Sequence, residues 1–225
     1  MGHILAIDTS SGTSVAVLKD GVTLSEIEIA DTRSHTESIG TAINEALKVA
    51  GVPPVRISAV AVGRGPAPFT GLRVGIAAAI MFTEGVGAKL FGLISLDAIA
   101  RQEFRARGVA NGGTLADDQP LLVASDARRS EHYWALYSGL DRHGVPIRID
   151  GPAVNRPAAI EEALKNRGIS AATAETVISA RAIGELFEAQ SAAGLLDTDV
   201  TALYLRNPDA VEPKNLRDFG KKVSG

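Results

Sequence analysis

The stretch HILAIDTSSGTSVAVLKDG, residues 3–21, decides the class of fold. Its first six residues form an apolar run that ends at Asp8, which is typical of a buried strand. The run TSVAVLKDG is rich in Val and Thr, and its Asp20-Gly21 pair is a strong hairpin signal before a third such run at 22–30. The chain is therefore expected to open with three strands in a meander.

A second strand that ends in aspartate opens the other half of the chain. The run PLLVASD, residues 120–126, ends at Asp126, and EHYWALYS at 131–138 is again typical of a strand. A strand that ends in aspartate and is followed by another strand thus occurs twice. This repetition predicts a duplicated α/β unit.

Helical and strand patterns alternate through the rest of the chain. Residues 34–51 have helical spacing, with Ser34 and Glu37 placed as a capping box. Further helices are predicted at 70–84, 96–107, 156–168 and 179–194, and further strands at 57–63, 89–95 and 202–206.

The Gly-rich, aperiodic residues 108–119 predict a linker between two lobes. This division gives an N-terminal lobe at 1–107 with partner-binding helices, and a C-terminal lobe at 120–225 whose last residues could pack back on the first lobe.

Composition limits the class of protein. The chain has 225 residues, 45% of them apolar and 22% charged, which is typical of a soluble globular protein. Its net charge of −3 lacks the basic surplus of a free-standing nucleic-acid binder. The absence of cysteine excludes disulfides, thiolate zinc sites and a cysteine nucleophile. The N-terminus does not resemble a signal peptide and the longest apolar run, 74–82, is short for a bilayer, so a cytoplasmic protein is expected.

Two loops contain residue types that could hold an anion. Asp8, Thr9 and Ser10 could form a turn whose backbone amides face a phosphate, or simply an Asx-type turn in a hairpin. In the second half Asp126 is in place, but Ala127, Arg128 and Arg129 follow where close approach of a phosphate favours glycine. The prediction is a degenerate phosphate loop, and a complete nucleotide cradle is not expected.

Other catalytic and metal sites have little support. No HxxxH, HExxH or GxSxG pattern occurs, so no metal site and no catalytic residue is predicted. A Ser-His-Asp triad that assembles only in space stays open. The chain has four histidines, which are His3, His35, His132 and His143.

The junction GRGPAPFTGLRVG, residues 63–75, is not a P-loop. Thr70 is predicted to cap the following helix, and Phe69 to pack against Val74. Arg73 lies in the first helical turn, where the helix dipole disfavours a cation by ~0.3–1 kcal/mol. We therefore expect Arg73 to meet a carboxylate, either in its own fold or in a partner.

The helix beyond this junction is apolar nearly all round and rich in small residues. One side can face the sheet and the helix at 35–50 can cover another. The two helices could still leave an apolar ridge exposed to solvent, and such a ridge marks a protein interface. The alternative is that the chain's own fold buries all of these apolar residues.

Five blocks resemble, in this order, the bacterial TsaB (YeaZ) family: ILAIDTSSGTSVAVL, SHTESI, VAVGRGPAPFTGLRVGIAAA, DARRSEHYWALY and LYLRNPDA. The GPxxFTGLRxG pattern is the most specific, although Ala67 and Pro68 stand where the family often has Gly and Ser. The resemblance implies an α/β, two-lobed actin-like or sugar-kinase-like ATPase (ASKHA) fold with duplicated mixed-sheet units. It also implies that the metal-binding histidine pair of the related TsaD enzyme is missing.

The resemblance further implies a role in tRNA modification. It implies that such proteins are non-catalytic partners of TsaD. Together with the ATPase TsaE, they support the transfer of a threonylcarbamoyl group to the adenosine 3′ of the anticodon in tRNA. They pair with TsaD, or with themselves as a homodimer, through N-lobe helices that correspond to 35–50 and 71–85. The interface positions expected here are His35, Ile39, Ile43, Leu47, Leu72, Arg73, Ile76 and Ile80.

The same resemblance implies no cofactor in the isolated chain, a possible nucleotide at a composite interface with TsaD and TsaE, and tRNA contact only through the complex. The alternatives are an autonomous nucleotide-dependent phosphotransferase or ATPase of the same fold and, in keeping with an older glycoprotease-like label, a peptidase.

Overall fold

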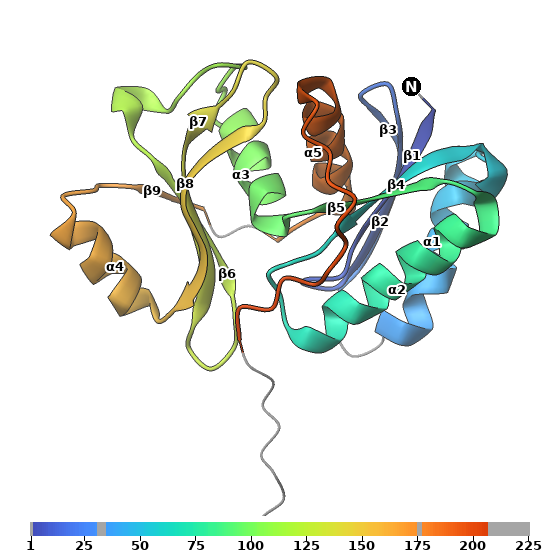
Figure 1. Ribbon diagram of the computed structural model, residues 1–225, viewed down its shortest axis with the longest axis horizontal. Coiled ribbons are helices and arrows are strands. Elements are labelled where there is room, and N and C mark those ends of the chain that lie inside the picture. Colours follow the sequence, from blue (N-terminus) through green and yellow to red (C-terminus); the bar gives the residue numbers. More distant parts are fainter. Residues whose placement is uncertain (1, 31–34, 175–176, 207–225) are drawn as a thin grey trace, which may run out of the picture.

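In the computed structural model, residues 2–30, 35–174 and 177–206 are described, without the side chains of residues 35–37. They form two mixed sheets with helices around and between them (Figure 1). The first sheet has the order β3-β2-β1-β4-β5, in which β1 pairs antiparallel with β2 and parallel with β4. Its strands are β1 (His3–Asp8), β2 (Thr13–Lys19), β3 (Val22–Ile29), β4 (Ile57–Gly63) and β5 (Lys89–Leu93).

The second sheet repeats the first four positions of this order. It runs β8-β7-β6-β9, with β6 antiparallel to β7 and parallel to β9. Its strands are β6 (Leu121–Asp126), β7 (His132–Leu140), β8 (Pro146–Asn155) and β9 (Ala172–Ala174). The predicted duplication is therefore confirmed, and with it the two-lobed actin-like fold class.

The local sequence explains why some strands were predicted and why β8 and β9 were not. Asp20 and Gly21 adopt positive φ angles of 50° and 80°, as the predicted hairpin turn between β2 and β3 requires. Strand β8 was not predicted because two prolines and a glycine interrupt its pattern, which an edge strand tolerates. Strand β9 has only three residues, too few to show a period.

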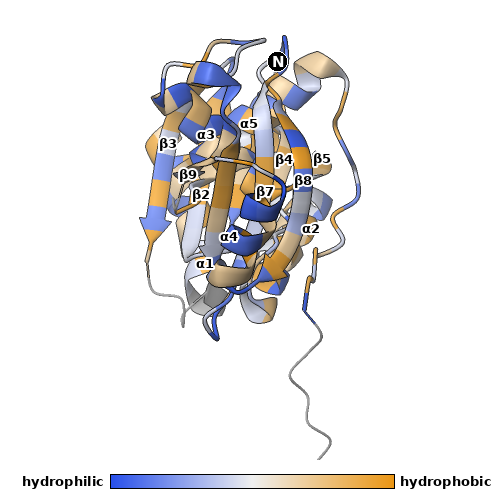
Figure 2. Cartoon of the chain, turned by 90° about the vertical axis from the view of Figure 1, so that its left-hand side faces the viewer, coloured by the Kyte–Doolittle hydropathy of each residue, from blue (hydrophilic) through white to orange (hydrophobic). Residues whose placement is uncertain are grey.

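The helices divide between the outer faces and the space between the sheets (Figure 1). Helices α1 (His35–Ala50) and α2 (Phe69–Val86) cover one face of the first sheet, while α3 (Ser95–Ala106) and α5 (Ala180–Ala193) lie between the two sheets. Helix α4 (Pro157–Asn166) covers the outer face of the second sheet and turns hydrophilic residues outward (Figure 2). Two short 3₁₀ helices are η1 (Pro54–Arg56) and η2 (Ala116–Asp118).

Strand β1 is buried on both faces because helices cover both sides of the sheet. Leu5 and Ile7 pack toward α1 and α2, whereas Ile4 and Ala6 pack toward α3 and α5. This two-sided burial is why the sequence shows a continuous apolar run rather than an alternating one.

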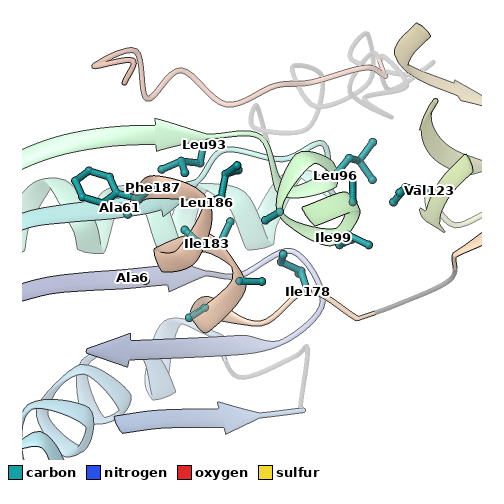
Figure 3. Packing of buried hydrophobic residues seen from close by; sticks show 14 of the residues in the cluster. Ala6, Ala61, Leu93, Leu96, Ile99, Val123, Ile178, Ile183, Leu186 and Phe187 are labelled. Carbon is teal, nitrogen blue, oxygen red and sulfur yellow. The ribbon is translucent and has the colours of Figure 1, made fainter. Parts of the chain in front are cut away.

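A single core cluster joins the two lobes. Ile183, Leu186 and Phe187 of α5 pack near Leu93 of β5, and Leu96 of α3 lies toward the second sheet (Figure 3). Asp97 of α3 also accepts hydrogen bonds from Tyr137 Oη at 2.7 Å and from Arg148 at 3.0 Å, both on the second sheet. The boundary at 108–119 stays a prediction, and α5, which follows the second sheet in sequence, packs on the first.

Residues 195–206, which we call the strap, correct one prediction. The expected strand at 202–206 is wrong, because this segment is irregular and makes only isolated backbone hydrogen bonds. Gly92 N donates to Asp197 O at 3.0 Å, and Leu203 N donates to Arg64 O at 2.8 Å. The strap thus runs from the edge strand β5 past the start of α2 (Figure 1).

Candidate functional site

The first candidate loop is filled by its own side chains. Asp8 is 1% exposed, and its carboxylate accepts hydrogen bonds from Ser10 N at 2.7 Å and Ser95 Oγ at 2.8 Å. Burial raises the pKa of Asp8 above its ordinary value, although these hydrogen bonds oppose the rise. Thr9 is also buried, and its Oγ1 donates to Gly71 O at 2.8 Å. The loop is therefore an Asx-type turn in which Asp8 and Thr9 face the protein interior.

Two glycines of the 63–75 junction make room for this loop. A Cβ at Gly63 would lie 1.9 Å from Asp8 Oδ2, and a Cβ at Gly75 would lie 2.3 Å from Thr9 Oγ1. Because neither distance is possible for real atoms, only glycine fits beside these side chains. The junction thus seats α2 against the Asp8 loop.

The second loop repeats the turn but not the burial. Arg128 N donates to Asp126 Oδ1 at 2.7 Å, just as Ser10 N donates to Asp8 Oδ1. Asp126 is exposed. After Ala127, the residues Arg128, Arg129 and Ser130 all have positive φ angles, of 62°, 55° and 58°. This left-handed run is uncommon for residues other than glycine.

A cavity of about 370 Å³ lies between the two loops. Of the four predicted phosphate-loop residues, the structure brings Ser10 and Asp126 to its wall and leaves Asp8 and Thr9 out of the lining. Among the described residues, the lining has no lysine and no glycine, which are the usual phosphate-holding residues of such loops. Its residues are Ser10, Ser11, Pro66, Ala67, Pro68, Ala124, Ser125, Asp126, Arg128, His132 and Val177.

Among the described residues, no three His, Cys, Asp or Glu side chains gather where they could hold a metal ion. His132 lies on the cavity wall beside Asp126, whereas His3 and His143 belong to other parts of the fold. The side chain of His35 and the predicted cap Ser34 lie outside the described residues.

The helix pair is in place, and five of the eight predicted interface residues are buried within the chain itself. Ile39, Ile43 and Leu47 of α1 are buried in the chain's own core, where they pack toward the first sheet. Leu72 and Ile76 of α2 are buried there as well. The reason is that the apolar stripe of an amphipathic helix first covers its own sheet, so the stripe does not mark the outer surface.

Helix α2 nevertheless exposes apolar residues on its outer side. Met81 is 76% exposed and Ile80 is 40% exposed, and Ala77 between them and Arg73 is also exposed. A groove of about 510 Å³ runs between this side of α2 and the strap. Its lining consists of Arg73, Ile76, Ala77, Ile80, Val200, Thr201, Ala202 and Tyr204.

The start of α2 differs from the prediction. The helix begins at Phe69 after Pro68, without a side-chain cap, so Thr70 is an ordinary first-turn residue and Phe69 precedes no cap. Arg73 meets no carboxylate among the described residues. Its guanidinium lies 3.6 Å from the centre of the Phe69 ring, and its Nε donates to Tyr204 Oη at 3.0 Å.

Sequence reasoning missed the strap as part of this surface. Tyr204 stacks on Phe69 with ring centres 4.6 Å apart, and Arg64 pairs with Asp197 at 3.6 Å and Asp199 at 2.9 Å. The only available signal was the pair of aspartates and the aromatic residue in an otherwise aperiodic segment, which predicts no contact by itself.

Helix α2 also has the length and composition of a membrane span. Its 18 residues have a mean hydropathy of 1.3, and a third of the helix is buried. The apolar run at 74–82, judged too short to cross a bilayer, is thus part of a longer apolar helix. Because Leu72, Ile76 and Ala79 pack on the first sheet, we interpret α2 as a sheet-covering helix with an apolar outer side.

Comparison with known proteins gives a consistent set of relatives. The family model described as "TsaD: tRNA N6-adenosine threonylcarbamoyltransferase" matches residues 22–183. An uncharacterised protein of Mycobacterium leprae is 36% identical over 93% of this chain and 56% of its own length. The Escherichia coli tRNA threonylcarbamoyladenosine biosynthesis protein TsaB is 33% identical over 72% of this chain and 66% of its own length. The chain therefore spans between about half and two thirds of these curated relatives.

Solved structures share the fold. A Pseudomonas aeruginosa protein, described as uncharacterised with similarity to peptidase YeaZ, has a TM-score of 0.73 and 25% identity. The match covers 92% of this chain and 100% of that one.

Proposed function

Because this chain belongs to the family of the TsaD model and to its TsaB (YeaZ) members, we propose that it is a partner protein in tRNA threonylcarbamoyladenosine biosynthesis. In this role it binds TsaD and supports threonylcarbamoylation of the adenosine 3′ of the anticodon, without performing the transfer itself.

The outer side of α2 is the observation that carries this proposal. A helix with a mean hydropathy of 1.3 that is buried over only a third of its length leaves apolar area in water. Met81, Ile80 and Ala77 lie on this open side, and small residues allow another helix to approach closely. We therefore assign TsaD docking to this side of α2, with Arg73 at one end.

The hydrogen bonds within the Asp8 loop favour a partner role over a catalytic role. The Asp8 carboxylate is engaged by Ser10 and Ser95, and Thr9 is engaged by Gly71, so these groups point away from the cavity between the loops. An autonomous phosphotransferase would need such groups to reach a bound nucleotide or its metal ion.

The same proposal covers the oligomeric state of the chain, its other partners and its location. The isolated chain pairs with itself through α2 as a homodimer, and TsaD replaces the second copy when the complex forms. TsaE joins the pair, and a nucleotide binds where this chain meets TsaD and TsaE. The tRNA is contacted through the complex, which operates in the cytoplasm, and no cofactor is needed by this chain alone.

Light scattering of this chain with its cognate TsaD tests the docking proposal. The mixture should contain a one-to-one species that neither protein forms alone. Met81→Glu places a charge on the open side of α2 and should weaken that species at least about tenfold, since burial of an unpaired charge is unfavourable.

The matched control is Ile149→Glu on strand β8, because this residue is 50% exposed and belongs to the second sheet. It should leave pairing unchanged. If Met81→Glu and Ile149→Glu pair with TsaD equally well, the assignment to α2 is wrong; if the unmodified chain does not pair, the partner role itself fails.

A further inference from the structure

The strap contacts both lobes of the chain (Figure 1). On the first lobe, a Cβ at Gly92 of β5 would lie 2.1 Å from Asp199 O, so the strap lies directly against the edge of the sheet. On the second lobe, Arg206 at the other end of the strap donates to Ala127 O at 2.8 Å and pairs with Glu131. The strap thus crosses between the lobes on the surface, in addition to the core cluster that joins them inside.

A single residue separates the contact of the strap with α2 from its contact with the second lobe. Tyr204 stacks on Phe69 and accepts a hydrogen bond from Arg73, both at the start of α2. Two residues further on, Arg206 binds the second lobe. A step of two residues spans at most about 7 Å, and Leu205 between them packs partly against the core cluster. A shift of Tyr204 is therefore transmitted to Arg206 with little slack.

Arg206 holds an uncommon turn in place. The turn at 127–131 joins β6 to β7, and its residues 128–130 all lie in the left-handed region, which non-glycine residues rarely adopt. Such a conformation persists when surrounding contacts hold it. The Arg206 guanidinium supplies these contacts at both ends of the turn, because it binds the Ala127 carbonyl and the Glu131 carboxylate.

The strap can detach more readily than the elements beneath it. None of its residues, 195–206, is buried, and none belongs to a helix or strand. A segment with few buried contacts opens at a small cost in free energy, whereas a core cluster opens only with the fold around it. The strap therefore has the properties of an element with two states, seated and released.

We propose that the strap couples the start of α2 to the 127–131 turn. While Tyr204 is seated on α2, Arg206 holds the turn in its left-handed conformation. When Tyr204 is released, Arg206 leaves the turn and the turn relaxes. Tyr204 also lines the groove beside the open side of α2, and Arg128 lines the cavity between the two loops. A molecule that fills the groove therefore alters the wall of that cavity, and a change at the turn alters the groove in return.

Hydrogen–deuterium exchange of the isolated full chain, measured by mass spectrometry, tests this coupling. Two amides are hydrogen-bonded within the turn, Ala127 N to Glu131 O at 2.9 Å and Glu131 N to Arg128 O at 3.1 Å, and peptides over the turn report their opening. Arg206→Gln should speed this exchange by about tenfold, which is the expected effect of losing a hydrogen bond to a charged group. Tyr204→Ala should speed it by at least about threefold, since it removes the aromatic contacts that seat the strap.

The double variant separates coupling from independent packing. If Tyr204 acts on the turn through Arg206, Tyr204→Ala should not speed exchange further in a chain that already carries Arg206→Gln. Arg167→Gln is the matched control, because it removes an ion pair of the second lobe, to Asp150, at the end of α4. This control should leave exchange in the turn unchanged.

Three results would overturn the proposal. The first is unchanged exchange of the turn in Tyr204→Ala, and the second is that the effects of Tyr204→Ala and Arg206→Gln multiply in the double variant. The third is an equal rise in the exchange of the β1 amides, which would mean that the variants loosen the whole fold rather than the turn. Because no partner is present in these measurements, failure of TsaD pairing would leave all three readouts unaffected.

Discussion

Arg73 and Tyr204, which are separated by 131 residues, share a hydrogen bond of 3.0 Å at the start of α2. The same guanidinium lies over the Phe69 ring, so a cation that the helix dipole disfavours is held by two aromatic residues. One of these residues belongs to the strap, and the open side of α2 is therefore built from two distant parts of the chain.

This contact gives a graded prediction for Tyr204. Tyr204→Phe keeps the ring stack and loses the hydrogen bond, which should lower the free energy of unfolding by about 0.5 kcal/mol. Tyr204→Ala also removes the contacts with Phe69 and Arg73 and should lower it by about 1–2 kcal/mol. Urea unfolding measures both values, and equal effects of the two variants would contradict a contribution from the ring.

The fit between α2 and the Asp8 loop predicts opposite effects of two glycine substitutions. Gly75→Ala would place a Cβ 2.3 Å from Thr9 Oγ1 and should destabilise the fold by about 1–3 kcal/mol. Gly40→Ala is the matched control, because Gly40 lies inside α1 with nothing within 4 Å of the added Cβ. It should stabilise the fold by about 0.5–1 kcal/mol. Thermal unfolding distinguishes the two, and a neutral Gly75→Ala would refute the tight fit.

Burial of Asp8 predicts a pH-dependent difference between this chain and Asp8→Asn. Because burial raises the pKa of Asp8 in the folded state, the folded state binds its proton more tightly than the unfolded state. The stability that Asp8 contributes is therefore greatest near and below its ordinary pKa of 3.8 and falls as the pH rises through the folded pKa. Asp8→Asn lacks this dependence and keeps an acceptor for Ser10 N.

Urea unfolding between about pH 4 and pH 7 measures this difference. The stability of Asp8→Asn relative to the unmodified chain should increase as the pH rises. A constant difference over this range would mean that Asp8 titrates alike in both states.

Anchoring of the strap by Arg64 predicts a local effect. Arg64→Gln removes the ion pairs to Asp197 and Asp199 and the hydrogen bond to Thr201 O, so the strap should open more often. Limited proteolysis followed by mass spectrometry should show faster cleavage within residues 195–206. Arg101→Gln is the control, since it removes a similarly buried ion pair, to Glu185, away from the strap. Equal cleavage in both variants would argue against anchoring by Arg64.

Much of the fold could be predicted because its signals are local. The apolar runs of β1, β4 and β6 and the spacing of α1 and α5 depend on neighbours in the sequence, and their predicted bounds agree closely with the structure. Prediction failed where a segment's conformation depends on distant contacts, as in β8, β9 and the strap. It also failed for the cap of α2, because the helix begins at Phe69, directly after Pro68, and Thr70 does not cap it.

The candidate site was predictable only in part. The sequence indicated the Asp8 and Asp126 loops and the helix pair, but it could not say which side of each helix is outside. Ile43 and Leu72 satisfy the pattern of an interface helix, yet both are used by the chain's own core.

The sequence by itself determined the repeated strand units, the family and the helices that could meet a partner. These features follow from the spacing of apolar residues, the turn residues and the order of motifs, which are all properties of nearby positions in the chain. Only the tertiary structure decided that Asp8 and Thr9 face inward, that Arg73 meets Tyr204 and that Met81 rather than Ile43 lies on the open surface. The physical reason is that burial and pairing depend on which distant segments meet, and that is decided by the packing of the whole chain.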